Sequence, residues 1–333
     1  MSIFSFFHSV YAWVCYFIFM VRHRYVGWPT INRKTGEFSR EQQPLFKKLK
    51  MLFLFNPLTE WIDETSQYRK YLHDKTVRSQ AKEEAPKSKE DIPGFIQRYH
   101  INMDDFEPSV WKEYPSFQQF FIRHHKPGAR PIYAEDDGTI AVVPSDCRVT
   151  TYNTVAETKK LWIKGRGWSI SRLIHDSELA QSWTDGAVGC FRLSPQDYHR
   201  YHCPVSGVVE WDKFIPGDYY GVDPLAVTSR VDILAENARH CVCINSEEFG
   251  RVLFVAIGAE DVGTVKINEK FTQKGAKVRK GDEVGIFEFG GSSIIVAFER
   301  GSIQWDGDLI AWSRKGVMVD VEVGMRMGRA AKG

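Results

Sequence analysis

Short apolar runs rich in β-branched residues recur along most of this chain of 333 residues. Ile140–Val143, Arg251–Ile257 and Ile294–Phe298 are examples, each with glycine, proline or aspartate nearby. Runs of this length and composition predict strands. Few long amphipathic patterns separate them after Thr139, whereas residues 92–135 are expected to be mainly helical. The chain is therefore predicted to have an α+β fold, with an N-terminal helical region followed by a β-rich domain.

The charge balance argues against a polyanionic partner. Lys plus Arg total 44 and Asp plus Glu total 42, which gives a net charge of +2. So small an excess provides no global field for nucleic acid, and we expect no nucleic-acid partner. Six cysteines in a chain of this length indicate free thiols rather than a disulfide scaffold.

The N-terminal residues 1–25 are predicted to associate with a membrane. Val10–Val21 is continuously apolar, and no charged side chain precedes Arg22 and Arg24. Spanning a bilayer takes about 20 predominantly apolar residues, so the segment is at the borderline between spanning the bilayer and lying on its surface. Positive charge after it favours a cytosolic position for the rest of the chain. The alternative is an aromatic helix packed on the protein's own core.

Residues 26–91 are predicted to form a helical and linker region before a domain over 92–333. Phe46–Ile62 combines lysines, aliphatic residues and tryptophan, a composition typical of a helix in a membrane interface or of a buried helix. Asp74–Asp91 is polar with mixed charge, which indicates a solvated linker or a frayed helix.

Three motifs supply candidate catalytic residues. Asp146 lies in VPSDCR, His199 and His202 in LSPQDYHRYHCP, and Ser292 in FEFGGSSI. An Asp, a His and a Ser can activate the serine, because the imidazole takes the hydroxyl proton and the carboxylate fixes its tautomer. No Gly-x-Ser-x-Gly elbow surrounds Ser292, which argues against a serine hydrolase. Its oxygen instead follows two flexible glycines and could attack the carbonyl of Gly291.

Each motif alone also has a structural interpretation. Asp146 could be a turn residue, two histidines three apart are often structural, and Gly-Gly-Ser-Ser suits a tight turn. The histidines and nearby cysteines lack the paired spacing of a zinc site, so no metal is expected. His124, His125 and His240 are interpreted as ordinary surface or partly buried histidines.

These motifs together resemble those of phosphatidylserine decarboxylases. The resemblance covers about 92–328 and rests on LSPQDYHRYHCP, FEFGGSSII, VVPSDCRV, KGDEVG, FQQFFIRHHKPGARPI, WIKGRGWSISRLI and VAIGAEDVGTVKI. The Gly-Gly-Ser-Ser form, with Cys147 where many members have glycine, resembles the eukaryotic non-mitochondrial type.

The resemblance implies a self-processing decarboxylase domain over 92–333. Ser292 would attack the carbonyl of Gly291, and the chain would divide into a β chain, 1–291, and an α chain, 292–333, that stay associated. Ser292 would become a pyruvoyl group, the only cofactor. Asp146 and His202 match the residues for processing, with His202 as base, and His199 matches the histidine of the decarboxylation step. Ser293 is the alternative nucleophile.

The activity implied is that of a carboxy-lyase. Phosphatidylserine would form a Schiff base with the pyruvoyl group and yield phosphatidylethanolamine and CO₂; the alternative substrate is a free amino acid, aromatic ones included. The expected partners are phosphatidylserine and membrane lipid, and a homo-oligomer is left open. The expected location is an endomembrane with the catalytic domain facing the cytosol, in preference to mitochondria.

Overall fold

The computed structural model describes residues 28–40, 65–161, 163, 168–220, 232–259, 265–288 and 292–331. The predicted membrane segment 1–25, the predicted interfacial segment 46–62 and Gly291 lie outside these residues. Within the described part of the chain, no helix is both long enough and apolar enough to cross a bilayer.

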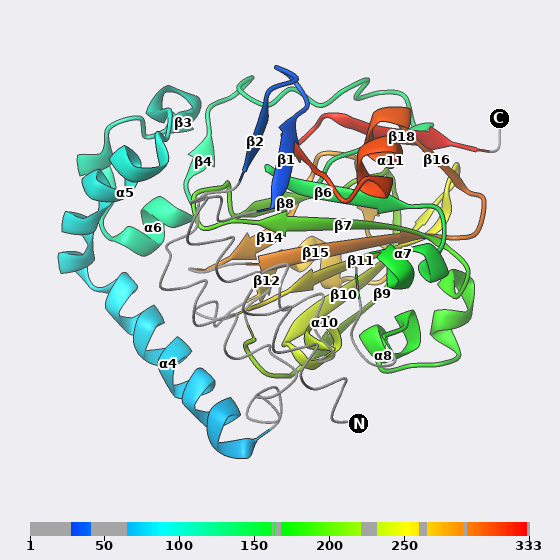
Figure 1. The fold of residues 1–333 in the computed structure, drawn as a ribbon, viewed down its shortest axis with the longest axis horizontal. Coiled ribbons are helices and arrows are strands. Elements are labelled where there is room, and N and C mark those ends of the chain that lie inside the picture. Colours follow the sequence, from blue (N-terminus) through cyan, green and yellow to red (C-terminus); the bar gives the residue numbers. More distant parts are fainter. Residues whose placement is uncertain are drawn as a thin grey trace, which may run out of the picture.

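The described residues form helices and a larger number of strands (Figure 1). The α-helices are α4 (Ser66–Glu84), α5 (Ile92–Tyr99), α6 (Phe117–Phe121), α7 (Val155–Leu161), α8 (Ile170–Ile174), α10 (Ile233–Glu236) and α11 (Gly307–Arg314). The shorter 3₁₀ helices are Pro86–Asp91, Met103–Asp105, Trp111–Glu113, Leu179–Trp183 and Glu269–Thr272.

A sheet of ten strands runs through the centre of the molecule, in the order β13-β9-β10-β11-β15-β7-β6-β17-β1-β2. These strands are β13 (Lys277–Val278), β9 (Gly207–Ile215), β10 (Arg239–Ser246), β11 (Gly250–Ile257), β15 (Ser292–Phe298), β7 (Ala187–Leu193), β6 (Cys147–Tyr152), β17 (Met318–Val321), β1 (Pro29–Asn32) and β2 (Phe38–Arg40). Apart from the parallel pair of β1 with β17, neighbouring strands in this sheet are antiparallel. The predicted α+β class is thus confirmed.

Three smaller sheets accompany the central one, in the orders β12-β14-β8, β16-β18-β5 and β3-β4. Their strands are β12 (Val265–Ile267), β14 (Glu283–Phe287), β8 (Arg200–His202), β16 (Ile303–Trp305), β18 (Arg326–Ala330), β5 (Ile140–Val142), β3 (Phe106–Glu107) and β4 (His124–His125).

The central sheet is covered on both faces. Along β15, Ile294 and Val296 belong to a core shared with β8 and β14, whereas Ile295 and Ala297 belong to a core shared with α8 and α10. Successive side chains of a strand point to opposite faces, so a strand buried on both faces is apolar throughout. Every residue of β15 is accordingly buried.

Residues 29–40 form two strands, although the sequence predicts helix or linker for 26–91. Strand β1 pairs in parallel with β17, and Thr30 lies opposite Met318. The four residues of β1 have no strong alternating pattern of their own, and their partner strand lies nearly 290 residues further along the chain. A local pattern cannot reveal a pairing of that range. Helix α4 (Ser66–Glu84) lies in the same region.

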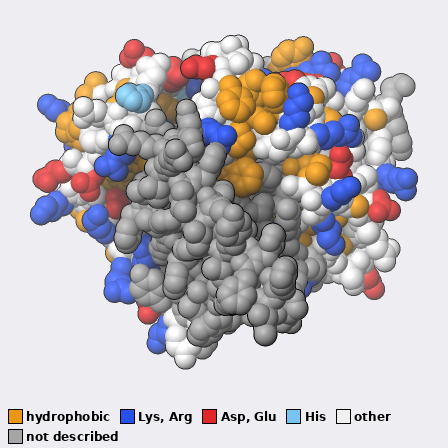
Figure 2. Space-filling model, viewed as in Figure 1, with side chains coloured by type: hydrophobic (Ala, Val, Ile, Leu, Met, Phe, Trp, Pro, Cys, Tyr) orange, Lys and Arg blue, Asp and Glu red, His pale blue; other side chains and the backbone are white. Residues whose placement is uncertain are grey.

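Charges of both signs are interspersed over the face of the molecule drawn in Figure 2, and hydrophobic side chains gather near its upper centre, where β1 and β2 lie in Figure 1. Phe38 of β2 is 54% exposed. The cysteines that the structure describes are all buried and free, as predicted for them.

We predict that Gly285→Ala destabilises the fold by about 1–3 kcal/mol, because overpacking of a closed site has that cost. A Cβ at Gly285 would lie 2.0 Å from the backbone oxygen of Lys266 on the neighbouring strand. Gly94→Ala in α5 is the matched control, because a Cβ there meets nothing within 4 Å. Thermal unfolding should show a lower midpoint for the first variant only. Equal midpoints would contradict the packing described for β12 and β14.

Candidate active site

Ser292 is the first residue of β15 and is fully buried. It lies opposite Leu193 at the end of β7, and the segment that follows β7 carries His199 and then enters β8, which ends at His202. Among the described residues, the Oγ atom of Ser292 has no hydrogen-bond partner. A buried hydroxyl without a partner is costly in a structural role, which favours a chemical role for this atom.

Ser292 and Ser293 point to opposite faces of the central sheet, because side chains alternate along β15. Ser292 shares the face of Ile294, whose core also contains Tyr201 of β8. Ser293 shares the face of Ile295 and lines a small cavity of about 20 Å³ with Met318. The two serines are therefore not equivalent: only Ser292 faces the layer that contains β8.

His199 and His202 do not lie on a helix, so the helical spacing that would give them a common face does not apply. His202 ends strand β8, and His199 precedes that strand. His199 is fully buried, its Nδ1 lies 2.9 Å from the backbone oxygen of Asp197, and its ring centroid is 3.9 Å from that of Phe121. Its backbone oxygen accepts a hydrogen bond from the amide of Phe287, which ties the loop to β14.

His202 is held by both of its ring nitrogens. Nδ1 lies 2.8 Å from the backbone oxygen of Gly281, and Nε2 lies 3.1 Å from the hydroxyl oxygen of Tyr198. A carbonyl oxygen only accepts, so Nδ1 carries the proton and Nε2 carries the lone pair. Burial lowers the pKa of His202, against the opposing effects of the Gly281 carbonyl and nearby carboxylates. The imidazole is thus neutral near pH 7 and able to accept a proton.

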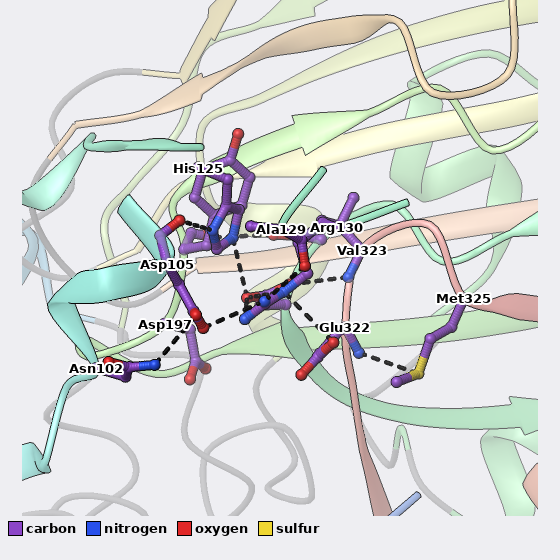
Figure 3. A network of polar contacts seen from close by, with 12 residues as sticks. Asn102, Asp105, His125, Ala129, Arg130, Asp197, Glu322, Val323 and Met325 are labelled. Carbon is purple, nitrogen blue, oxygen red and sulfur yellow. Dashed lines mark hydrogen bonds and ion pairs between the residues drawn. The ribbon is translucent and has the colours of Figure 1, made fainter. Parts of the chain in front are cut away.

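Asp146 is the centre of a polar network, and Figure 3 shows its partners His125, Arg130 and Val323. The carboxylate of Asp146 lies 3.2 Å from Nε2 of His125 and 3.1 Å from Nη2 of Arg130, and it accepts a hydrogen bond of 2.8 Å from the amide of Val323. Burial alone would raise the pKa of Asp146, but the hydrogen bond from His125 and the charge of Arg130 outweigh it and leave that pKa below its usual value. The carboxylate is therefore ionised at neutral pH.

The direct contact expected between Asp146 and His202 is absent from the interactions of the described residues. The carboxylate instead contacts His125, whose ring centroid lies 4.1 Å from that of Tyr198, and the hydroxyl of Tyr198 reaches His202. The interpretation of His125 as an ordinary histidine is thus incomplete. A signal was present, because His125 lies within FIRHHKPG, one of the stretches that carry the resemblance.

A cavity of about 220 Å³ adjoins this network, and Asp146, Arg148, Asp197 and Tyr198 are among its lining residues. The ion pairs Arg130–Asp146 and Arg148–Asp197 offset much of its charge. Among the described residues, no group of three or more His, Cys, Asp or Glu side chains is arranged to hold a metal ion.

The comparison with known proteins identifies the family. A family model described as phosphatidylserine decarboxylase matches residues 117–329. A "phosphatidylserine decarboxylase proenzyme" of Fusobacterium nucleatum is 34% identical over 298 residues, which cover 90% of this chain and 96% of that protein. The chain belongs to the phosphatidylserine decarboxylase family.

Eukaryotic relatives are also similar but longer. A "phosphatidylserine decarboxylase proenzyme 2" of Oryza sativa is 43% identical over 73% of this chain and 39% of that protein. One with the same name from Komagataella phaffii is 36% identical over 89% of this chain and 29% of that protein. The chain spans between 26% and 39% of the length of four such eukaryotic relatives.

We predict that Asp146→Asn lowers the stability of the protein at pH 7 by about 2 kcal/mol, because it breaks a largely buried ion-pair network. The pKa of Asp146 is depressed in the folded state. Its stabilising effect is therefore complete above the unfolded-state pKa of about 4 and is lost as the pH falls through the folded-state value. Denaturant unfolding at several pH values should show the difference between variant and parent shrinking below about pH 4. A difference that stays constant with pH would contradict this electrostatic account.

Proposed function

We propose that this protein is a pyruvoyl-dependent phosphatidylserine decarboxylase that makes its own prosthetic group from Ser292. The observation that carries the proposal is the buried hydroxyl of Ser292 at the start of a central strand, which has no hydrogen-bond partner among the residues that the structure describes, in a chain of this family. The word "proenzyme" in the names of the relatives supports a processing step.

Self-processing begins with the hydroxyl of Ser292. Its Oγ attacks the carbonyl carbon of Gly291, the C–N bond of that peptide breaks, and an ester forms with a free amine on Ser292. Loss of the Cα proton then expels the carboxylate of Gly291 and leaves a dehydroalanine. Water adds to the imine tautomer and ammonia leaves, so a ketone becomes the new N-terminus. The step uses only water as a co-reactant.

The histidines have separate roles in this proposal. His202 is neutral because burial lowers its pKa, so it can take the proton of Ser292. His199, buried beside Phe121, returns a proton to the substrate carbon during decarboxylation or positions the substrate. The pyruvoyl group would supply the electron sink for the charge left when CO₂ departs.

The fold explains how two chains remain one protein after the cut. Strand β15 pairs along its length with β11 and β7, and β17 pairs with β1 and β6. Both β15 and β17 belong to the smaller product, 292–333, while their partners belong to the larger one. Cleavage before Ser292 therefore leaves a strand inserted in the middle of the sheet.

The substrate proposed is phosphatidylserine at a membrane surface, with the catalytic domain facing the cytosol. The names of the relatives support this lipid, and the apolar run before Arg22 and Arg24 supports membrane association. A domain boundary near residue 92, an endomembrane rather than a mitochondrial location, and self-association remain parts of the proposal. The alternative substrate is a free amino acid.

We predict that Ser292→Ala yields one intact chain, whereas Ser293→Ala is cut between residues 291 and 292. Only the first change removes the hydroxyl on the face of the central sheet that packs against the layer containing β8. Intact mass of the two purified variants measures cleavage directly. An uncut Ser293→Ala chain, or a cut Ser292→Ala chain, would contradict the assignment of the nucleophile.

We predict that His199→Ala is still cut but releases CO₂ from phosphatidylserine at least about 100-fold more slowly, the scale of a lost general acid. Labelled phosphatidylserine in mixed micelles and a panel of free amino acids, offered to the same wild-type preparation, decide the substrate. Phosphatidylserine should be preferred. Faster release of CO₂ from a free amino acid would overturn that choice, and an uncut His199→Ala chain would mean that the roles of the histidines are divided differently.

A further inference from the structure

Tyr198 lies between His202 and His125, the histidine that contacts Asp146. Its hydroxyl is 3.1 Å from Nε2 of His202, and its ring centroid is 4.1 Å from that of His125. It is 4% exposed, and burial raises the pKa of its hydroxyl, so that group remains a donor at neutral pH. Since Nε2 of His202 carries the lone pair, the hydroxyl of Tyr198 donates to it.

His125 is held in turn on both sides. Its Nε2 lies 3.2 Å from the carboxylate of Asp146, and its Nδ1 lies 3.3 Å from the backbone oxygen of Asp105. Its ring is also stacked on Phe106, with centroids 4.6 Å apart and planes 18° from parallel. These contacts fix the plane on which the ring of Tyr198 packs.

We infer that His125 and Tyr198 are positioning residues for self-processing, through which Asp146 orients the imidazole of His202. The inference rests on the proposed function, because it concerns the cleavage that this function requires. Asp146 would then act on His202 through two intervening side chains, because it holds His125 against Tyr198. His202 would be held at the correct tilt by two hydrogen bonds, one that its Nδ1 donates to the carbonyl of Gly281 and one that its Nε2 accepts from the hydroxyl of Tyr198, rather than by one.

The test compares rates of self-cleavage in full-length chains made by cell-free translation and followed by the appearance of the two products. Tyr198→Phe keeps the ring but removes the donor, and His125→Ala removes the ring that supports it. Each should slow cleavage at least about tenfold, a part of what a general base contributes. The double variant should be about as slow as the slower single variant, because residues that act as a unit are not additive.

The pH dependence of the cleavage rate distinguishes a positioning role of these residues from a merely structural one. His202 faces the carboxylates of Glu283 and Asp146, the ring of His125 and the carbonyl of Gly281. A donor to the neutral imidazole favours its neutral form, and the interaction with His125 also lowers the pKa of His202, so removing either one raises that pKa. Cleavage needs the neutral form of His202. As the pH is lowered, cleavage should therefore begin to slow at a higher pH in Tyr198→Phe and in His125→Ala than in the wild type. A merely structural role would lower the rate without moving the profile.

Matched controls are available elsewhere in the fold. His240 also contacts a carboxylate, with Nε2 2.8 Å from Asp212, and the hydroxyl of Tyr114 also donates a partly buried hydrogen bond, 2.7 Å to the backbone oxygen of Pro108. His240→Ala and Tyr114→Phe should cleave at the wild-type rate. His125→Gln keeps a donor for Asp146 and should cleave faster than His125→Ala.

Wild-type rates in both single variants, effects that multiply in the double variant, or unchanged pH profiles would each overturn the inference. An uncut wild-type chain would instead contradict the proposed function itself. Folding of the slow variants is checked by thermal unfolding in a Ser292→Ala background, where no chain is cut. Midpoints close to that of the background exclude global unfolding as the cause.

Discussion

The pairing of β15 with strands on both of its sides is the constraint on which the rest of the site depends. Ser292 begins this strand, so the hydrogen bonds of β11 and β7 fix the residues that follow it. The hydroxyl is thereby presented at the end of a rigid element, buried and without a competing hydrogen bond among the described residues. A reactive group placed in this way loses little freedom when it attacks the neighbouring peptide.

Electrostatics divides the site into a neutral part and a charged part. The carboxylate of Asp146 stays ionised through His125 and Arg130, whereas burial keeps the imidazole of His202 neutral. Groups whose surroundings move their pKa values in this way can be assigned distinct roles at one pH. Tyr198 joins the two parts without carrying charge itself.

Much of the fold and of the site follows from the sequence. The β-branched run 294–298 is a strand, and the motifs around Asp146, His202 and Ser292 lie in or beside strands of neighbouring layers. These features could be predicted because strand propensity and turn residues act locally. The family resemblance is confirmed by the match over 117–329.

Other features needed the three-dimensional structure. The pairing of β1 with β17 joins the two ends of the described chain, and no periodicity within Pro29–Asn32 announces it. The contact between His125 of β4 and Asp146, which directly precedes β6, depends on how separate strands come together, so chain order suggested His202 as the partner instead. The alternation along β15 was predictable, but which face would meet β8 depends on packing between layers.

The central claim is that the chain cuts itself before Ser292 and converts that residue into a ketone. Intact mass of the purified wild-type protein, under denaturing conditions, tests it most directly. The account predicts two polypeptides that meet between residues 291 and 292, the smaller one lighter than a fragment starting with serine by the mass of one ammonia molecule. A single uncut polypeptide, or a smaller fragment that begins with unmodified serine, would contradict it.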